Sequence, residues 1–161
     1  MAYKNRKIEK YKNSGLTFIE FVIVLAILAV ISVIVMSAFV NYRKNQSLEK
    51  DTETVVEVLG QARSQTLSSQ NASQYGVRIG SDKITLFTGN TYSSSDPANR
   101  DFTLVSTDTI VTVSLAGGES DVVFQRLSGE TNQNGTIVLS SPTISKTKTV
   151  TIYKTGLIES N

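Results

Sequence analysis

The feature that most restricts the fold of this sequence is an uncharged apolar run of twenty residues, Phe21–Val40. As a helix, this run would be about 30 Å long, which matches the hydrocarbon core of a bilayer. A helix in the core of a small soluble domain does not need to be apolar on every face. The run therefore predicts a helix that is surrounded by lipid or by similar helices.

The charge distribution predicts how this helix is oriented. Residues 1–15 carry five basic side chains and one acidic one, whereas the other 146 residues carry 11 basic and 13 acidic side chains. Basic flanking segments stay in the cytoplasm, so we expect Met1 inside and the C-terminal part across the membrane. A cleaved secretory signal is disfavoured, because its apolar segment has about 7–15 residues and small residues follow it. Here the bulky and charged segment Asn41–Lys44 follows.

Glu20 is the single charged residue between Leu16 and Val40. A carboxylate at a membrane boundary is costly unless another group compensates it. Cleavage after Gly15 would give Leu16 an α-ammonium group, and residues four apart share one helix face. Glu20 would then pair with that amine in its own chain or in a neighbouring chain, and the helix dipole also favours it. The alternative is that Glu20 merely lies in the headgroup region.

The segment from Ser14 to Glu20, between a basic leader and an apolar helix, resembles the class III signal of type IV pilins and pseudopilins. In that family a prepilin peptidase cuts after the glycine and methylates the new N-terminal residue. The resemblance implies cleavage between Gly15 and Leu16, N-methylation of Leu16 and a role of Glu20 in subunit docking. It also implies four partners: the prepilin peptidase, other pilin or pseudopilin subunits, an inner-membrane assembly platform and the lipid bilayer.

The helical pattern continues beyond the apolar run, from residue 41 to residue 69, so one helix is predicted from about Leu16 to Ser69. We expect one face of the second half to pack on a sheet, with Asp51, Glu53 and Glu57 on the wet faces. The apolar stripe has a spacing close to 3.6 residues and consists of Leu48, Val55, Val56, Leu59, Ala62 and Leu67.

Beyond Gln70 the apolar period changes to two, and Val, Ile, Thr, Phe and Tyr become frequent, as in strands. The predicted fold class is α+β, with the long helix packed on one antiparallel sheet or two small ones, as in the pilin fold. The predicted parts are a leader (1–15), a membrane helix (16–40), its amphipathic continuation (41–69) and a β-rich domain (70–161). The predicted strands are Gln74–Ile79, Ile84–Thr88, Phe102–Val105, Thr109–Leu115, Asp121–Arg126, Thr136–Ser140 and Lys148–Tyr153.

Within the pilin-like families, the C-terminal part is similar to H-type pseudopilins and FimT-like minor pilins. The similarity lies in residues 59–64, 123–129, 135–139 and 150–158. Some FimT-like pilins bind DNA through an arginine-containing motif after a glycine, but here Leu157, Ile158 and Glu159 follow Gly156. No nucleic-acid partner is therefore expected. The basic group of Lys146, Lys148 and Lys154 is interpreted as a solvated edge strand.

The chain contains no His and no Cys, which excludes imidazole and thiol catalysis and His/Cys zinc sites. We expect no enzyme activity, no catalytic residues, no cofactor and no metal site. The oxygen-rich loop with Asp96, Asn99 and Asp101 also holds Arg100 and has no EF-hand spacing, so a plain loop is predicted.

The predicted function is a minor pilin or pseudopilin of a type IV pilus or type II secretion-like filament. It would lie first in the inner membrane, as a single-pass protein with a cytoplasmic N-terminus, and then in an extracytoplasmic filament. The alternative is an uncleaved single-pass membrane-anchored module that binds an extracellular ligand.

Overall fold

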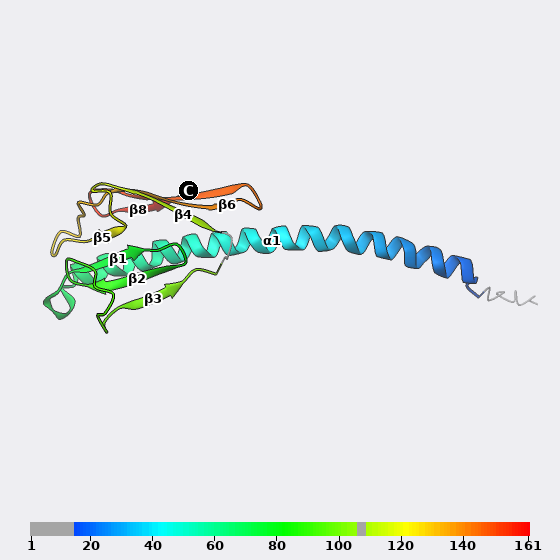
Figure 1. The fold of residues 1–161 in the computed structure, drawn as a ribbon, viewed down its shortest axis with the longest axis horizontal. Coiled ribbons are helices and arrows are strands. Elements are labelled where there is room, and N and C mark those ends of the chain that lie inside the picture. The colour runs from blue at the N-terminus through cyan, green and yellow to red at the C-terminus, as the bar shows by residue number, and fades with distance from the viewer. Residues whose placement is uncertain (1–14, 106–108) are drawn as a thin grey trace, which may run out of the picture. The chain divides into compact units, whose positions relative to one another are not determined.

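A computed structural model of the chain describes residues 15–105 and 109–161. The helix α1 (Phe18–Leu67) has 50 residues. The short 3-10 helix η1 (Gln70–Ala72) and eight strands follow in the described residues (Figure 1). By its internal contacts the chain divides into two units, one up to Phe39 and one from Val40 to Asn161. The long apolar N-terminal helix and the antiparallel sheets on which α1 packs confirm the predicted α+β class.

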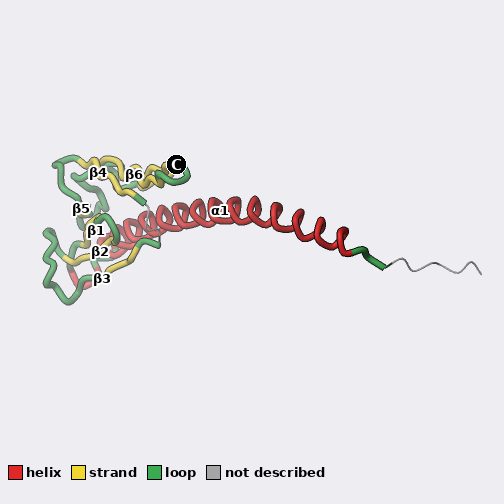
Figure 2. The backbone as a smooth tube through the Cα atoms, turned by 45° about the vertical axis from the view of Figure 1, so that its right-hand side comes forward, coloured by secondary structure: helices red, strands yellow, loops and turns green. Residues whose placement is uncertain are grey.

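The strands, which are yellow in Figure 2, form two four-stranded sheets, and every neighbouring pair is antiparallel. The first sheet has the order β3-β2-β1-β5, with bounds β1 (Tyr75–Ile79), β2 (Lys83–Thr88), β3 (Arg100–Thr103) and β5 (Asp121–Val123). The second sheet has the order β4-β6-β7-β8, with bounds β4 (Ile110–Leu115), β6 (Gly135–Ser141), β7 (Lys146–Ile152) and β8 (Ile158–Ser160).

Each of the seven predicted segments overlaps a strand, but several bounds differ for physical reasons. The predicted segment Phe102–Val105 becomes β3, which starts two residues earlier because Arg100 pairs with Leu86. The predicted strand Asp121–Arg126 ends at Val123, because Gln125 N–H donates to the Glu130 carbonyl (2.8 Å) and closes a turn. Strand β8 was not predicted, since its three residues carry no alternating pattern and depend on pairing with β7.

One face of α1 and both sheets share a single apolar core in the second unit. Of the predicted stripe, Leu48, Val55, Leu59 and Ala62 are buried, Val56 is half-buried and Leu67 is exposed. The stripe also includes polar side chains, because hydroxyl groups can bond to the helix itself. Thr52 Oγ1 donates to the Leu48 carbonyl (2.8 Å), and Thr66 Oγ1 donates to the Ala62 carbonyl (2.8 Å). The complete buried set is Leu48, Asp51, Thr52, Val55, Val58, Leu59, Ala62 and Thr66.

The prediction that Asp51 lies on a wet face is wrong, because its side chain is fully buried. Its Oδ1 accepts a hydrogen bond from the backbone N–H of Val105 (2.6 Å), and its Oδ2 accepts one from Thr109 Oγ1 (3.4 Å). A buried carboxylate is tolerated when hydrogen bonds satisfy it. Asp51 thus attaches the segment that follows β3 to the helix, which explains why β3 does not extend to Val105.

Candidate functional site

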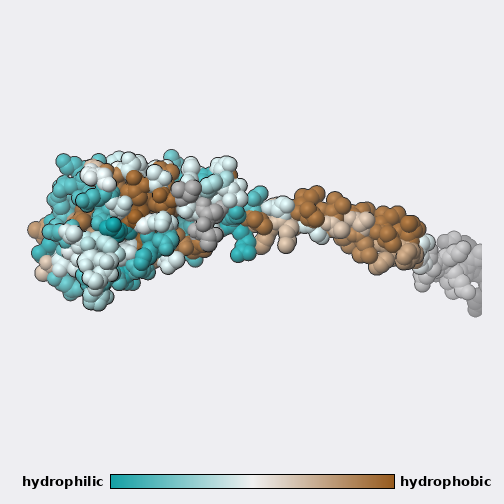
Figure 3. Space-filling view, viewed as in Figure 1, coloured by the Kyte–Doolittle hydropathy of each residue, from teal (hydrophilic) through white to brown (hydrophobic). Residues whose placement is uncertain are grey.

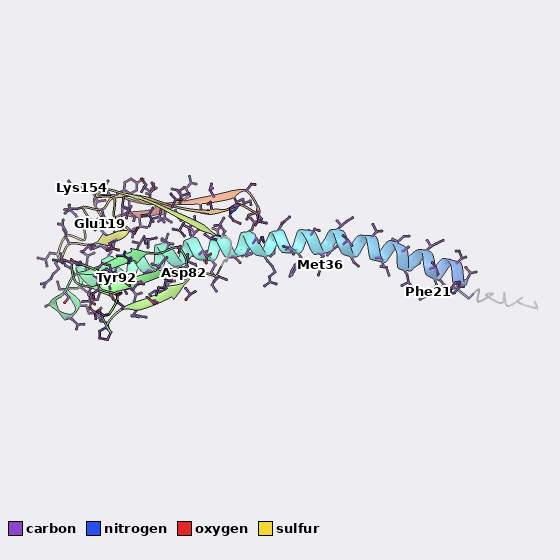
Figure 4. All side chains as sticks on the ribbon, viewed as in Figure 1. Phe21, Met36, Asp82, Tyr92, Glu119 and Lys154 are labelled. Carbon is purple, nitrogen blue, oxygen red and sulfur yellow. The ribbon has the colours of Figure 1, made fainter. Side chains whose placement is uncertain are left out.

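The first unit presents an apolar surface along α1. The large apolar side chains from Phe18 to Val40 are between 41% and 83% exposed, and Figure 3 shows this surface in brown almost throughout. Phe21 and Met36 are examples whose side chains extend outward from the helix (Figure 4). In the described part of the chain, α1 is long and apolar enough to cross a membrane, and its most apolar stretch is unburied.

The two hydroxyl groups in the apolar surface are already bonded to the helix that carries them. Ser32 Oγ donates to the Leu28 carbonyl (2.7 Å), and Ser37 Oγ donates to the Val33 carbonyl (3.2 Å). A polar group without a partner is expensive in hydrocarbon, and these bonds remove that cost. The surface therefore suits an environment without water, either lipid or closely packed helices.

The start of α1 is a reciprocal capping box built from Thr17 and Glu20. The Thr17 side-chain Oγ1 accepts from Glu20 N–H (3.3 Å), while Glu20 Oε2 accepts from Thr17 N–H and from Thr17 Oγ1–H (3.4 Å each). The first helical bond runs from Phe21 N–H to the Thr17 carbonyl (3.1 Å). Two backbone N–H groups at the helix end are thereby satisfied by side chains.

The capping role of Thr17 is a feature that the sequence interpretation missed. The pattern Thr-x-x-Glu before an apolar run is a recognised signal for the start of a helix. In the described residues, the carboxylate of Glu20 bonds to Thr17 and not to Leu16. The chain has a peptide nitrogen at Leu16, whereas the predicted ion pair requires the ammonium group that cleavage would create.

The predicted cleavage bond lies just before this capping box. Gly15 and Leu16 are both exposed and precede the helix, which begins at Phe18. A Cβ placed on Gly15 would meet no atom within 4 Å. Exposed non-helical backbone is the kind that proteases reach most easily. The basic leader of residues 1–14 lies outside the described residues.

Several polar groups of the oxygen-rich segment 96–101, whose last two residues belong to β3, are bonded within the protein. Asp96 Oδ1 accepts from Ala98 N–H (2.9 Å), and Asn99 Nδ2 donates to the Ser93 carbonyl (2.7 Å). Asp101 accepts from Lys83 Nζ and from Thr85 Oγ1 (2.6 Å each). The hydrogen bonds from Lys83 and Thr85 lower the pKa of Asp101, and the bond to Asp101 raises the pKa of Lys83. Within the described residues, no cluster of acidic side chains suited to a metal ion occurs.

The structure separates the three lysines that the sequence grouped together. Lys146 and Lys148 both lie at the start of β7, whereas Lys154 follows the other end of that strand. Lys148 Nζ lies 3.1 Å from Glu49 Oε2 on α1. The lysines therefore do not form one track, and two of them lie beside the first turns of α1 in the second unit.

Gly156, where a DNA-binding motif was considered, has a structural role. Its backbone has φ +77°, and a Cβ there would meet the Gly129 carbonyl and Arg63 Nε. Arg63 Nε donates to the same Gly129 carbonyl (3.3 Å) and so ties α1 to this turn.

Comparison with models of protein families, with curated proteins and with solved structures finds no match to this chain.

Proposed function

We propose that the chain is a structural subunit, either a minor pilin or a pseudopilin, of a type IV pilus or type II secretion-like filament. It is made as a single-pass precursor in the inner membrane, with Met1 in the cytoplasm. A prepilin peptidase cuts the bond between Gly15 and Leu16 and methylates Leu16. An assembly platform then moves the subunit from the bilayer into the filament.

The observation that carries this proposal is the exposed apolar surface of residues 18–40. No other described part of the same unit covers this surface. A continuous apolar surface of this size marks contact with a membrane or with other proteins. A filament core made of such helices would replace lipid contacts by helix contacts. This exchange gains little from hydrophobicity alone, so packing and polar contacts must select the register.

The order of the residues at the N-terminal end supports the processing step. A small exposed residue, Gly15, is followed by one apolar residue and then by the capping box of Thr17 and Glu20. Cleavage at Gly15 would place an ammonium group on Leu16, within the first turn before Glu20. An ionised carboxylate and an ammonium group attract each other strongly where water is excluded.

Processing should depend on the size of the residue at position 15. Co-expressed with a prepilin peptidase, Gly15→Ala should be cut more slowly than the natural chain, and Gly15→Leu should be cut far more slowly still. The measurement is the fraction of shortened protein in membrane fractions over time. Equal and complete processing of both variants would refute the cleavage site.

The alternative function, a membrane-anchored binding module, shares the helix but retains the leader. In that case no shortened chain would form from the natural sequence under the same conditions. The processing assay thus separates the two functions without requiring a known ligand.

A further inference from the structure

We propose that a recess beside the first turns of α1 in the second unit binds the phosphate of an anionic phospholipid headgroup. The recess has a volume of about 390 Å³. The inference rests on the proposed insertion of residues 21–40 into a bilayer, but not on filament assembly. The recess is lined by Tyr42, Asn45, Gln46, Leu48 and Glu49 from α1 and by Lys146, Thr147 and Lys148 from β7.

The lining of the recess is rich in hydrogen-bond donors. Lys148 is held in place by Glu49, at 3.1 Å from Oε2 and 3.3 Å from Oε1. Gln46 Nε2 donates to Tyr42 Oη (3.4 Å), which leaves the tyrosine hydroxyl proton available for an anion. Lys146 is exposed at the rim. An ammonium group has three donors, so a lysine paired with a carboxylate still has hydrogen atoms to offer to a phosphate.

The position of the recess along α1 corresponds to the headgroup layer. At 1.5 Å per residue, Tyr42 lies about 3 Å beyond Val40, and Glu49 lies about 14 Å beyond it. The polar layer of a bilayer extends roughly 5–8 Å from each face of the hydrocarbon core. Tyr42 and Asn45 fall within this layer, and the long side chain of the exposed Lys146 can extend towards it. Tyr42, which is 60% exposed, is also the residue type that favours this interface.

Charge is concentrated at this end of the second unit. Residues 41–50 and 146–148 carry five basic side chains and one acidic one, whereas residues 51–145 and 149–161 carry six basic and 11 acidic ones. Basic residues beside the translocated end of a span oppose the expected orientation. Attraction to anionic lipid offsets that cost. A lipid phosphate fits better than a nucleic acid, because the basic group is short and adjoins the apolar run.

The experiment uses the full chain in detergent micelles and native mass spectrometry with phosphatidylglycerol or phosphatidylcholine of equal chain length. The natural chain should retain phosphatidylglycerol more tightly than phosphatidylcholine. The double variant Lys146→Gln/Lys148→Gln should bind phosphatidylglycerol about 25-fold more weakly, because each lysine near a membrane surface contributes about a fivefold effect. The matched control is Lys154→Gln, which removes an exposed lysine beyond the other end of β7 and should bind as the natural chain does.

A second variant distinguishes a ligand site from a structural ion pair. Glu49→Gln removes the single carboxylate of the recess, so retention of phosphatidylglycerol should increase. If the Lys148–Glu49 pair served only to hold β7 on α1, this substitution would leave retention unchanged or reduce it. Excess inorganic phosphate should compete poorly with the lipid, and complete displacement would overturn the lipid assignment in favour of a free phosphate.

The inference fails if the double variant and Lys154→Gln retain phosphatidylglycerol equally. It also fails if Lys146 and Lys148 are needed for the binding of an acidic peptide but not for the binding of lipid. Because the leader is the same in every variant, its basic residues do not affect these comparisons. Lysine-dependent lipid binding by a chain that is never cut would refute the filament function and keep the headgroup site. Normal cleavage without such binding would refute only the headgroup site.

Discussion

Glu20 has two roles: it caps the start of α1, and in the proposed filament it binds the new N-terminus. In the described chain its carboxylate completes a capping box with Thr17, at 3.4 Å from both the N–H and the hydroxyl of that residue. A carboxylate has about four lone-pair positions, so it can keep these bonds and also accept an ammonium group. Capping the helix and binding the new N-terminus are therefore compatible roles, and substitutions can separate them.

Glu20→Ala should leave the protein in the membrane but reduce its incorporation into filaments severely, because both the cap and the charge are lost. Glu20→Gln keeps a group that serves in a capping box but removes the charge, so it should also assemble poorly. Thr17→Ala loses the cap at a cost of about 1 kcal/mol and should assemble better than either Glu20 variant. The measurement is the ratio of filament-bound to membrane-bound protein, and normal incorporation of Glu20→Ala would refute the docking role.

The exposed pair of Lys83 and Asp101 should make the stability of the first sheet depend on pH. Hydrogen bonds from Lys83 and Thr85 lower the pKa of Asp101. The contribution of Asp101 to stability is therefore present above its ordinary pKa and is lost as the pH falls through the lowered value. The bond to Asp101 raises the pKa of Lys83, so that contribution is lost only as the pH rises through the raised value. The natural chain should therefore have a higher melting temperature than the Asp101→Asn variant between about pH 4 and pH 10. The difference in melting temperature should shrink in acid, and a difference that persists unchanged at pH 2 would contradict this role of the pair.

Helix α1 is the element that connects the two units, and two glycines near its C-terminal half have opposite requirements. Gly60 lies inside the helix, and a Cβ there would meet no atom within 4 Å, so it does not serve the close packing of a strand. Gly156 has φ +77° and no space for a Cβ beside the Gly129 carbonyl. Gly60 therefore only adds the entropic cost of a glycine inside a helix. At Gly156, by contrast, the positive φ and the close Gly129 carbonyl require a glycine.

Gly60→Ala should therefore stabilise the protein by about 0.5–1 kcal/mol. Gly156→Ala should destabilise it by about 2 kcal/mol or more, because it combines backbone strain with a steric clash. Denaturant unfolding of the full chain in detergent, followed by circular dichroism, measures both changes. Equal effects of the two substitutions would show that the turn at Gly156 does not constrain the helix.

The elements that depend on local pattern were predictable from the sequence. The extent of α1 and the strands β1, β2, β4, β6 and β7 follow from runs and alternations within each segment. Asp51 was misplaced because its partner, Val105 N–H, comes from 54 residues further along the chain. Thr66 was missed for a similar reason, since it accepts a hydrogen bond from Tyr75 N–H (3.0 Å) beyond the end of the helix. The capping box at Thr17 is local and readable, and it was missed because Glu20 was assigned to the amine of Leu16.

For the whole molecule, the central point is that a single helix has two different environments. Between Leu48 and Thr66, one face of α1 is covered by the core that both sheets share. Up to Phe39, its large apolar side chains are exposed. The second half is satisfied within its own chain, and under the proposed function the first half is covered by lipid or by other copies of such helices. In the proposed function, a cut at Gly15 removes the basic leader, whose charge favours the expected orientation of the precursor in the membrane.

The filament function is tested by the mass of the N-terminal peptide of the mature protein, taken from cells that make such filaments. We expect a peptide that starts at Leu16 and is heavier than the unmodified sequence by one methyl group. A mature protein in the filament fraction that still carries residues 1–15 would refute this function.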